Sequence, residues 1–120
     1  MQDVVITSAV RTAIGTFGGA LAGTPPCDLA AAVAQAAIDR ASITPSDVRQ
    51  SIFGNVIHTE PRDMYLARVA AIGAGVPDTA PALTLNRLCG SGLQAVVSAA
   101  EQIMLCKADI TLAGGAENMS

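Results

Sequence analysis

The sequence contains no tryptophan and one histidine; aromatic residues make up 2% and charged residues only 14% of its 120 positions. No apolar run reaches the roughly 18 residues expected of a membrane-spanning helix. A secretory signal is not expected, because Gln2 and Asp3 stand where a signal peptide carries basic residues. The net charge is −3 and lysine and arginine form no block. These absences argue against a role in binding nucleic acid or a membrane surface.

Cysteine is also scarce: the chain has only Cys27, Cys89 and Cys106. An odd number of cysteines without a secretory signal favours a reducing compartment and no structural disulfide, so we expect a cytoplasmic protein. No Cys-x-x-Cys pair or histidine-rich spacing indicates a metal site.

The remaining composition is 51% hydrophobic, and much of it is alanine and glycine. This composition is typical of a folded chain and excludes intrinsic disorder. The length allows one modest domain with a core of its own. Small side chains predict tight packing on both faces of a buried sheet.

Apolar periodicity predicts seven elements in the order β-α-β-α-β-α-β, which indicates an α/β fold with a mainly parallel sheet. Strands are expected at 4–6, 51–53, 81–85 and 109–113, and helices at 29–38, 64–74 and from Cys89 to Met104. Asp28 and Asp63 are expected N-caps, and Gly114-Gly115 is expected to end the last strand. No helix follows that strand, so we expect an incomplete sheet with an open face or edge.

The most informative position is Cys89, which lies between a predicted strand and a predicted helix. A helix N-terminus offers unpaired N–H groups and a partial positive charge, and both favour the reactive thiolate. Gly90 and Gly92 leave room for an approaching substrate. Cys89 is therefore the candidate nucleophile, although a small buried cysteine in an alanine-rich core is the alternative.

Four other residues and one charged cluster are weaker candidates. Cys27 lacks neighbouring glycines and is expected to be structural, and Cys106 near a helix C-terminus is expected to be inert. His58 could serve as a base but is expected to be a solvated loop residue. Glu117 follows the last strand, where α/β sites form, or it is a structural partner of an arginine. The charged cluster at 60–63 is expected to be a solvated turn.

Two motifs match other families in form only. Residues 90–95 fit G-x-G-x-x-A, the dinucleotide-binding pattern, with Asp109 downstream. However, this motif follows the third predicted strand, and Asp109 begins the next strand instead of ending it. A papain-type nucleophile is excluded, because residues 89–93 depart from that motif at its fourth and fifth positions.

Residues 86–95 (NRLCGSGLQA) resemble the acyl-enzyme cysteine motif of thiolases. Residues 8–15 with 17–19 resemble the thiolase N-terminal signature, and residues 113–120 resemble the segment after the cysteine-bearing helix. The loop at 59–65 is similar to that of bacterial β-ketothiolases. These segments occur in the family's order over nearly the whole chain.

The resemblance implies an acyltransferase of fatty acid metabolism acting on coenzyme A thioesters. Cys89 would take an acyl group from acyl-CoA, and the carbanion of acetyl-CoA would attack the acyl-cysteine, or free CoA would cleave 3-ketoacyl-CoA in reverse. Coenzyme A is then a substrate, and no cofactor or metal is implied. A homodimer or homotetramer is also implied, with the strand near 83–86 at a subunit contact.

The resemblance covers only the N-terminal part of a thiolase, truncated at residue 120, without the loop domain and the C-terminal half. In the family, the activating histidine, the acid/base cysteine and the Asn/His pair lie in that half, and neither His58 nor Cys106 matches them. The 120 residues alone are therefore expected to be inactive. The alternatives are a non-catalytic thiolase-like assembly module and a dinucleotide-binding half-domain.

Overall fold

Three parallel strands form the centre of the computed structural model, which describes residues 1–120. They are β1 (Gln50–Gly54), β2 (Ala82–Leu85) and β3 (Thr111–Gly115), in the spatial order β2-β1-β3. Ile52 of β1 lies opposite Leu83 of β2 and Ala113 of β3. The predicted α/β class and parallel sheet are confirmed, and the sheet is incomplete as expected.

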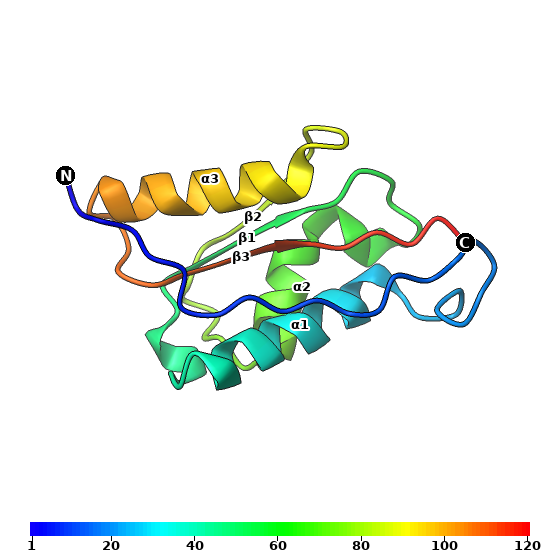
Figure 1. Cartoon of the computed structure of the whole chain (residues 1–120), viewed down its shortest axis with the longest axis horizontal. Helices are drawn as coiled ribbons and strands as arrows, with labels where there is room; N and C mark the ends of the chain where they lie inside the picture. Colours follow the sequence, from blue (N-terminus) through cyan, green and yellow to red (C-terminus); the bar gives the residue numbers. More distant parts are fainter.

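Helices cover both faces of this sheet (Figure 1). Helix α3 (Ser91–Met104) lies on one face, whereas α1 (Pro26–Arg40) and α2 (Leu66–Gly73) lie on the other. Two short 3₁₀ helices, η1 (Pro45–Asp47) and η2 (Pro61–Tyr65), precede β1 and α2 respectively. The result is a three-layer α/β/α arrangement. No helix combines the length and the apolar character needed to cross a membrane.

The core is divided by the sheet because successive strand residues point to opposite faces. Phe53 belongs to the larger cluster, between the sheet and the α1–α2 pair, whereas Ile52 packs beneath α3 with Ala95 and Ala99. Alanines at helical spacing line the buried sides of α1 and α2 and allow the two helices to approach closely. The alanines of the larger cluster are Ala30, Ala34, Ala67, Ala70, Ala71, Ala74 and Ala80.

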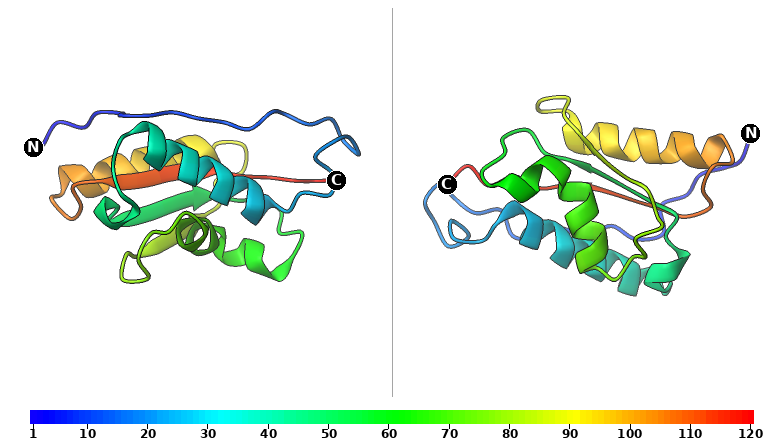
Figure 2. Two further views of the ribbon diagram at one scale, coloured as in Figure 1. Left: turned by 90° about the horizontal axis from the view of Figure 1, so that it is seen from below. Right: turned by 180° about the vertical axis from the view of Figure 1, so that it is seen from behind.

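The predicted first strand at 4–6 is wrong. Residues 2–17 run lengthwise past β3 without pairing with it (Figure 2), and Val5 and Ile6 are each 76% exposed. A groove of about 1060 Å³ is lined by this segment, by β3 and by faces of α1 and α3. The local pattern is strand-like, but a strand needs a neighbouring backbone within hydrogen-bonding distance, and none is present here.

Several predicted boundaries also differ. Helix α1 begins at Pro26 with Pro25 as its N-cap, so Asp28 lies in the first turn and does not cap it. The predicted helix at 64–74 is divided between η2 and α2. Gly114-Gly115 forms the end of β3 itself instead of following it. Proline at the first helical position explains the earlier start of α1, because its fixed φ suits that position and its missing N–H needs no acceptor there.

Candidate active site

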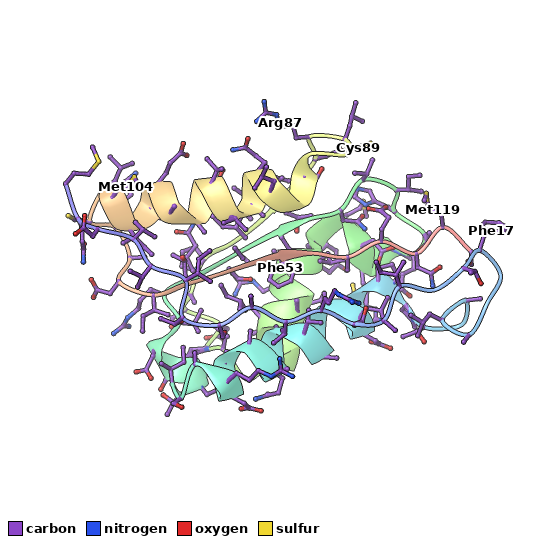
Figure 3. The ribbon with its side chains drawn as sticks, in the orientation of Figure 1. Phe17, Phe53, Arg87, Cys89, Met104 and Met119 are labelled. Carbon is purple, nitrogen blue, oxygen red and sulfur yellow. The ribbon has the colours of Figure 1, made fainter.

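Cys89 lies in a tight turn between β2 and α3 and is exposed, as Figure 3 shows at one end of α3. The preceding residue, Leu88, has a φ of 49°, which is unusual for a residue with a side chain. The Asn86 Oδ1 atom accepts a hydrogen bond of 2.9 Å from the Leu88 N–H. The predicted strand–turn–helix around Cys89 is confirmed, and the alternative of a buried cysteine is wrong.

Three backbone N–H groups in the turn and at the start of α3 have no hydrogen-bond acceptor within the protein, those of Cys89, Gly92 and Leu93. Helix N-termini leave such donors free, and their partial positive charge stabilises a nearby anion. No side chain is hydrogen-bonded to Cys89, and His58 makes its contact elsewhere. The turn therefore presents an exposed thiol beside free donors, without a base from these 120 residues.

The first turn of α3 rests directly on the ends of β1 and β3. An added Cβ at Gly54 would lie 2.7 Å from the Ser91 Cβ and 2.8 Å from its carbonyl carbon. An added Cβ at Gly115 would lie 3.5 Å from the Gly92 Cα. Glycine is needed at Gly54 because backbone atoms of the helix occupy the space of any side chain. This close approach places Cys89 at the carboxyl edge of the sheet.

The same edge carries a polar cluster that sequence reasoning only partly found. The buried Asn55 amide donates to the Ala116 carbonyl at 2.9 Å, and its oxygen contacts His58 Nδ1 at 2.5 Å. Glu117 accepts hydrogen bonds from the Val56 and Ile57 N–H groups at 3.0 and 2.7 Å. Glu117 is thus a partner of backbone amides instead of an arginine. His58 is exposed, as expected.

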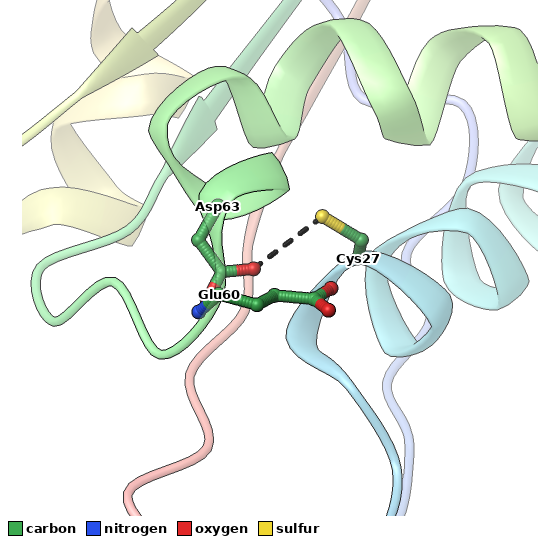
Figure 4. A group of neighbouring side chains, drawn as sticks. All are labelled: Cys27, Glu60 and Asp63. Atoms are coloured by element: carbon green, nitrogen blue, oxygen red, sulfur yellow. Dashed lines mark hydrogen bonds between the residues drawn. The ribbon is translucent and has the colours of Figure 1, made fainter.

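Cys27 forms a buried cluster with Asp63 on the α1 side of the sheet (Figure 4). Its thiol donates to Asp63 Oδ1 at 3.5 Å. Burial, followed by this hydrogen bond, raises the pKa of Cys27 to about 12. Cys27 is buried as a structural role requires, and its thiol stays protonated at neutral pH.

Asp63 is fully buried, so the expected solvated turn at 60–63 is wrong for this residue. Burial favours its protonated form, but hydrogen bonds from the Thr59 N–H and hydroxyl and the Glu60 N–H outweigh burial and lower its pKa. Asp63 is the third residue of η2, whose N-cap is Glu60, so it closes a capping box instead of capping a helix. A turn composition cannot reveal this, because one partner of Asp63 is Cys27 of α1, which is distant in the sequence.

Cys27, Glu60 and Asp63 also offer ligand atoms within 4.8 Å of one another. A metal would need the Cys27 thiolate, whereas this thiol is a hydrogen-bond donor whose pKa is raised by burial. The cluster therefore joins η2 to α1 and shows no features of a prepared ligand set.

The C-terminal segment is hydrogen-bonded to the loop at residues 18–24. Asn118 Nδ2 donates to the carbonyls of Leu21, Ala22 and Thr24 at 3.1, 3.2 and 2.8 Å. Ser120 Oγ accepts from the Gly18 N–H at 2.9 Å. The sequence offered only the resemblance of residues 113–120 to a family motif, and spacing alone gives no signal for contacts this far apart in the chain.

Comparison with known proteins shows which family combines these features. The model of the thiolase N-terminal domain matches residues 4–120. The chain belongs to the thiolase family. It is 59% identical over 119 residues to the β-ketothiolase BktB of Cupriavidus necator, and 52% identical over 120 residues to an acetyl-CoA acetyltransferase of that organism. The matches cover 99% and 100% of this chain but 30% of each relative, so the chain spans about a third of a thiolase.

Solved thiolase structures share the fold. The structure of a thiolase from Ascaris suum in complex with coenzyme A aligns with a TM-score of 0.94 and 33% identity, covering 99% of this chain and 31% of that one. The acetyl-CoA acetyltransferase of Bacillus anthracis aligns with a TM-score of 0.87 and 46% identity, covering 92% and 28% respectively. The predicted resemblance to the N-terminal part of thiolases is confirmed.

The geometry also disfavours the dinucleotide alternative. Asp109 lies before the amino end of β3, whereas the turn at residues 86–90 is at the carboxyl edge of the sheet. A ribose-binding carboxylate is needed at the same edge as the glycine-rich turn. In this thiolase chain, the buried Ser91 hydroxyl also donates its hydrogen bond within the turn, to the Leu88 carbonyl.

Proposed function

We propose that this chain supplies the nucleophile of a thiolase that transfers acyl groups between coenzyme A thioesters, and that Cys89 is this nucleophile. The observation that carries the proposal is the exposed Cys89 thiol at the start of α3, beside free backbone N–H groups, within the segment that matches the thiolase family. Relatives named as β-ketothiolase and acetyl-CoA acetyltransferase support the substrate class.

In the first step, the Cys89 sulfur attacks the carbonyl carbon of acyl-CoA. A new C–S bond forms, the bond to the coenzyme A sulfur breaks, and coenzyme A leaves after taking up a proton. One thioester replaces another, so this transfer is nearly balanced in free energy. The unpaired N–H groups at the helix start are suited to stabilise the oxyanion that develops on the carbonyl oxygen.

In the second step, acetyl-CoA that has lost a proton from its α-carbon attacks the acyl-cysteine. A C–C bond forms, the bond to Cys89 breaks, and 3-ketoacyl-CoA is released. The reverse direction is cleavage of 3-ketoacyl-CoA by coenzyme A. No side chain of this chain is hydrogen-bonded to the Cys89 thiol, so we assign the base and acid groups to the part of a thiolase that these residues do not span.

Peptide mass spectrometry of the intact protein after brief treatment with acetyl-CoA tests the nucleophile. We expect an acetyl group on Cys89, retained in Cys106→Ser and lost in Cys89→Ser. Cys106 is the matched control because it is also exposed and lies just beyond the other end of α3. Acetylation of another residue in the wild type would contradict the assignment. Turnover of acetyl-CoA by the purified 120-residue chain would contradict the assignment of the base to the rest of the thiolase.

The subunit contact is proposed to involve β2. This strand is one of the two edge strands of the sheet, and Leu83 at its centre is 47% exposed. An open edge with an exposed apolar side chain is a ready template for pairing with another chain. We expect Leu83→Lys to lower the mass of the assembly measured by sedimentation, whereas an unchanged mass would place the contact elsewhere.

A further inference from the structure

The turn that carries Cys89 is closed by one buried hydroxyl group. The Ser91 Oγ atom accepts a hydrogen bond of 2.7 Å from the Arg87 N–H and donates one of 2.7 Å to the Leu88 carbonyl. The Ser91 N–H also donates to that carbonyl, at 3.1 Å. Ser91 is 5% exposed, although the neighbouring turn residues are exposed. A single side chain therefore bridges the two residues that precede Cys89.

The bridge matters because Leu88 has a backbone conformation that leucine rarely adopts. Its φ of 49° is in the left-handed region, where the Cβ atom is crowded. Such a conformation persists only when the surrounding structure fixes it. Asn86 holds the Leu88 N–H and Ser91 holds the Leu88 carbonyl, so both polar groups of this residue are restrained.

Ser91 itself is fixed by the sheet. The backbone and Cβ atoms of Ser91 lie against Gly54, where an added Cβ would be 2.7 Å from the Ser91 Cβ. This contact anchors the first turn of α3 on the end of β1. The orientation of the Cys89 turn is thus coupled to the sheet through Ser91 and not only through chain connectivity.

We infer that Ser91 is a positioning residue for Cys89, and this inference rests on the proposed function of Cys89 as the nucleophile. Its hydroxyl keeps Leu88 left-handed and so directs the Cys89 thiol and N–H toward the place where the thioester carbonyl is attacked. Without the hydroxyl, the Arg87 N–H loses its acceptor and Leu88 is free to return to a common conformation. Misplacement of a nucleophile by about 1 Å can lower a rate by about 100-fold.

The test compares Ser91→Ala with Ser98→Ala in the intact protein. Ser98 is on the same helix, and its hydroxyl accepts a hydrogen bond from Gln94 but is not hydrogen-bonded to Leu88 or to the backbone of the Cys89 turn. We expect Ser91→Ala to lower kcat for acetyl transfer by about 10- to 100-fold with little change in KM, and Ser98→Ala to leave both unchanged. Wild-type kcat in Ser91→Ala would overturn the inference.

A second readout does not depend on activity. Cys106 is an exposed internal reference, so iodoacetamide alkylation gives the rate at Cys89 relative to Cys106 in one molecule. We expect Ser91→Ala to lower this ratio severalfold. If wild-type Cys89 takes no acetyl group, the proposed function fails, whereas the ratio still tests the positioning by Ser91.

If Ser91→Ala does not fold, Asn86→Ala provides the test. Asn86 is exposed, and its side chain restrains the same Leu88 residue from the other side. We expect a smaller fall in the ratio of Cys89 to Cys106 alkylation, because the Ser91 bonds remain. An unchanged ratio would overturn the inference that restraint of this turn sets the reactivity of Cys89.

Discussion

Replacing Gly54 by alanine would push the first turn of α3 away from the end of β1, at the point where the Cys89 turn is supported. The added Cβ would lie 2.7 Å from the Ser91 Cβ, 2.8 Å from its carbonyl carbon and 3.0 Å from its carbonyl oxygen. All three distances are shorter than the 3.4 Å at which ordinary contact begins. Two of these atoms are helix backbone and cannot rotate away, so the first turn of α3 must shift by several tenths of an ångström.

The cost follows from two opposing effects. Overpacking of a close contact destabilises a protein by about 1–3 kcal/mol. Replacing glycine by alanine also restricts the unfolded chain and returns about 0.4–1 kcal/mol. We therefore expect Gly54→Ala to lower the free energy of unfolding by about 1–2 kcal/mol, and to slow acetyl transfer at Cys89 because the turn moves with the helix.

Gly92→Ala is the matched control for stability. Gly92 is in the first turn of α3, next to Ser91, but an added Cβ at Gly92 would have no atom within 4 Å. Alanine is favoured over glycine in a helix by up to about 1 kcal/mol, so this variant should be as stable as the wild type or more so. Urea unfolding of the three proteins measures the difference. Equal stability of Gly54→Ala and Gly92→Ala would refute the steric argument.

The remaining predictions concern buried polar groups. The Cys27 thiol keeps its proton in the folded state up to about pH 12 but ionises near pH 9.0 when unfolded. Stability from this residue is thus present below pH 9 and should fall above it by up to about 1.4 kcal/mol per pH unit, and urea unfolding of Cys27→Ala should lack this slope. Asn118→Asp should cost about 1–3 kcal/mol and speed amide exchange in residues 18–24, because a carboxylate then faces three carbonyls. Glu117→Gln should lower the unfolding temperature, since one of two backbone N–H groups loses its acceptor. Unchanged exchange or melting would contradict these assignments.

Local sequence determined the elements whose signals are complete within a few residues. A short apolar run and helical apolar spacing predicted β2, α3 and the turn with Cys89, and the structure confirms this turn. The glycines around Cys89 and the apolar face of α3 need no distant partner to be recognised. Family membership could be predicted for the same reason, because the characteristic segments are continuous.

Only the tertiary structure decided which polar groups are buried and which strand-like segments pair. Residues 4–6 have a strand pattern but no backbone beside them, so they form no strand. Asp63 is buried and accepts a hydrogen bond from Cys27, 36 positions away, and Ser91 of α3 packs against Gly54 of β1. Periodicity records only whether a side chain faces a core, whereas hydrogen-bond partners and steric contacts depend on where distant segments meet. The candidate nucleophile could therefore be predicted from the sequence, but the hydrogen bonds and packing contacts that hold its turn could not.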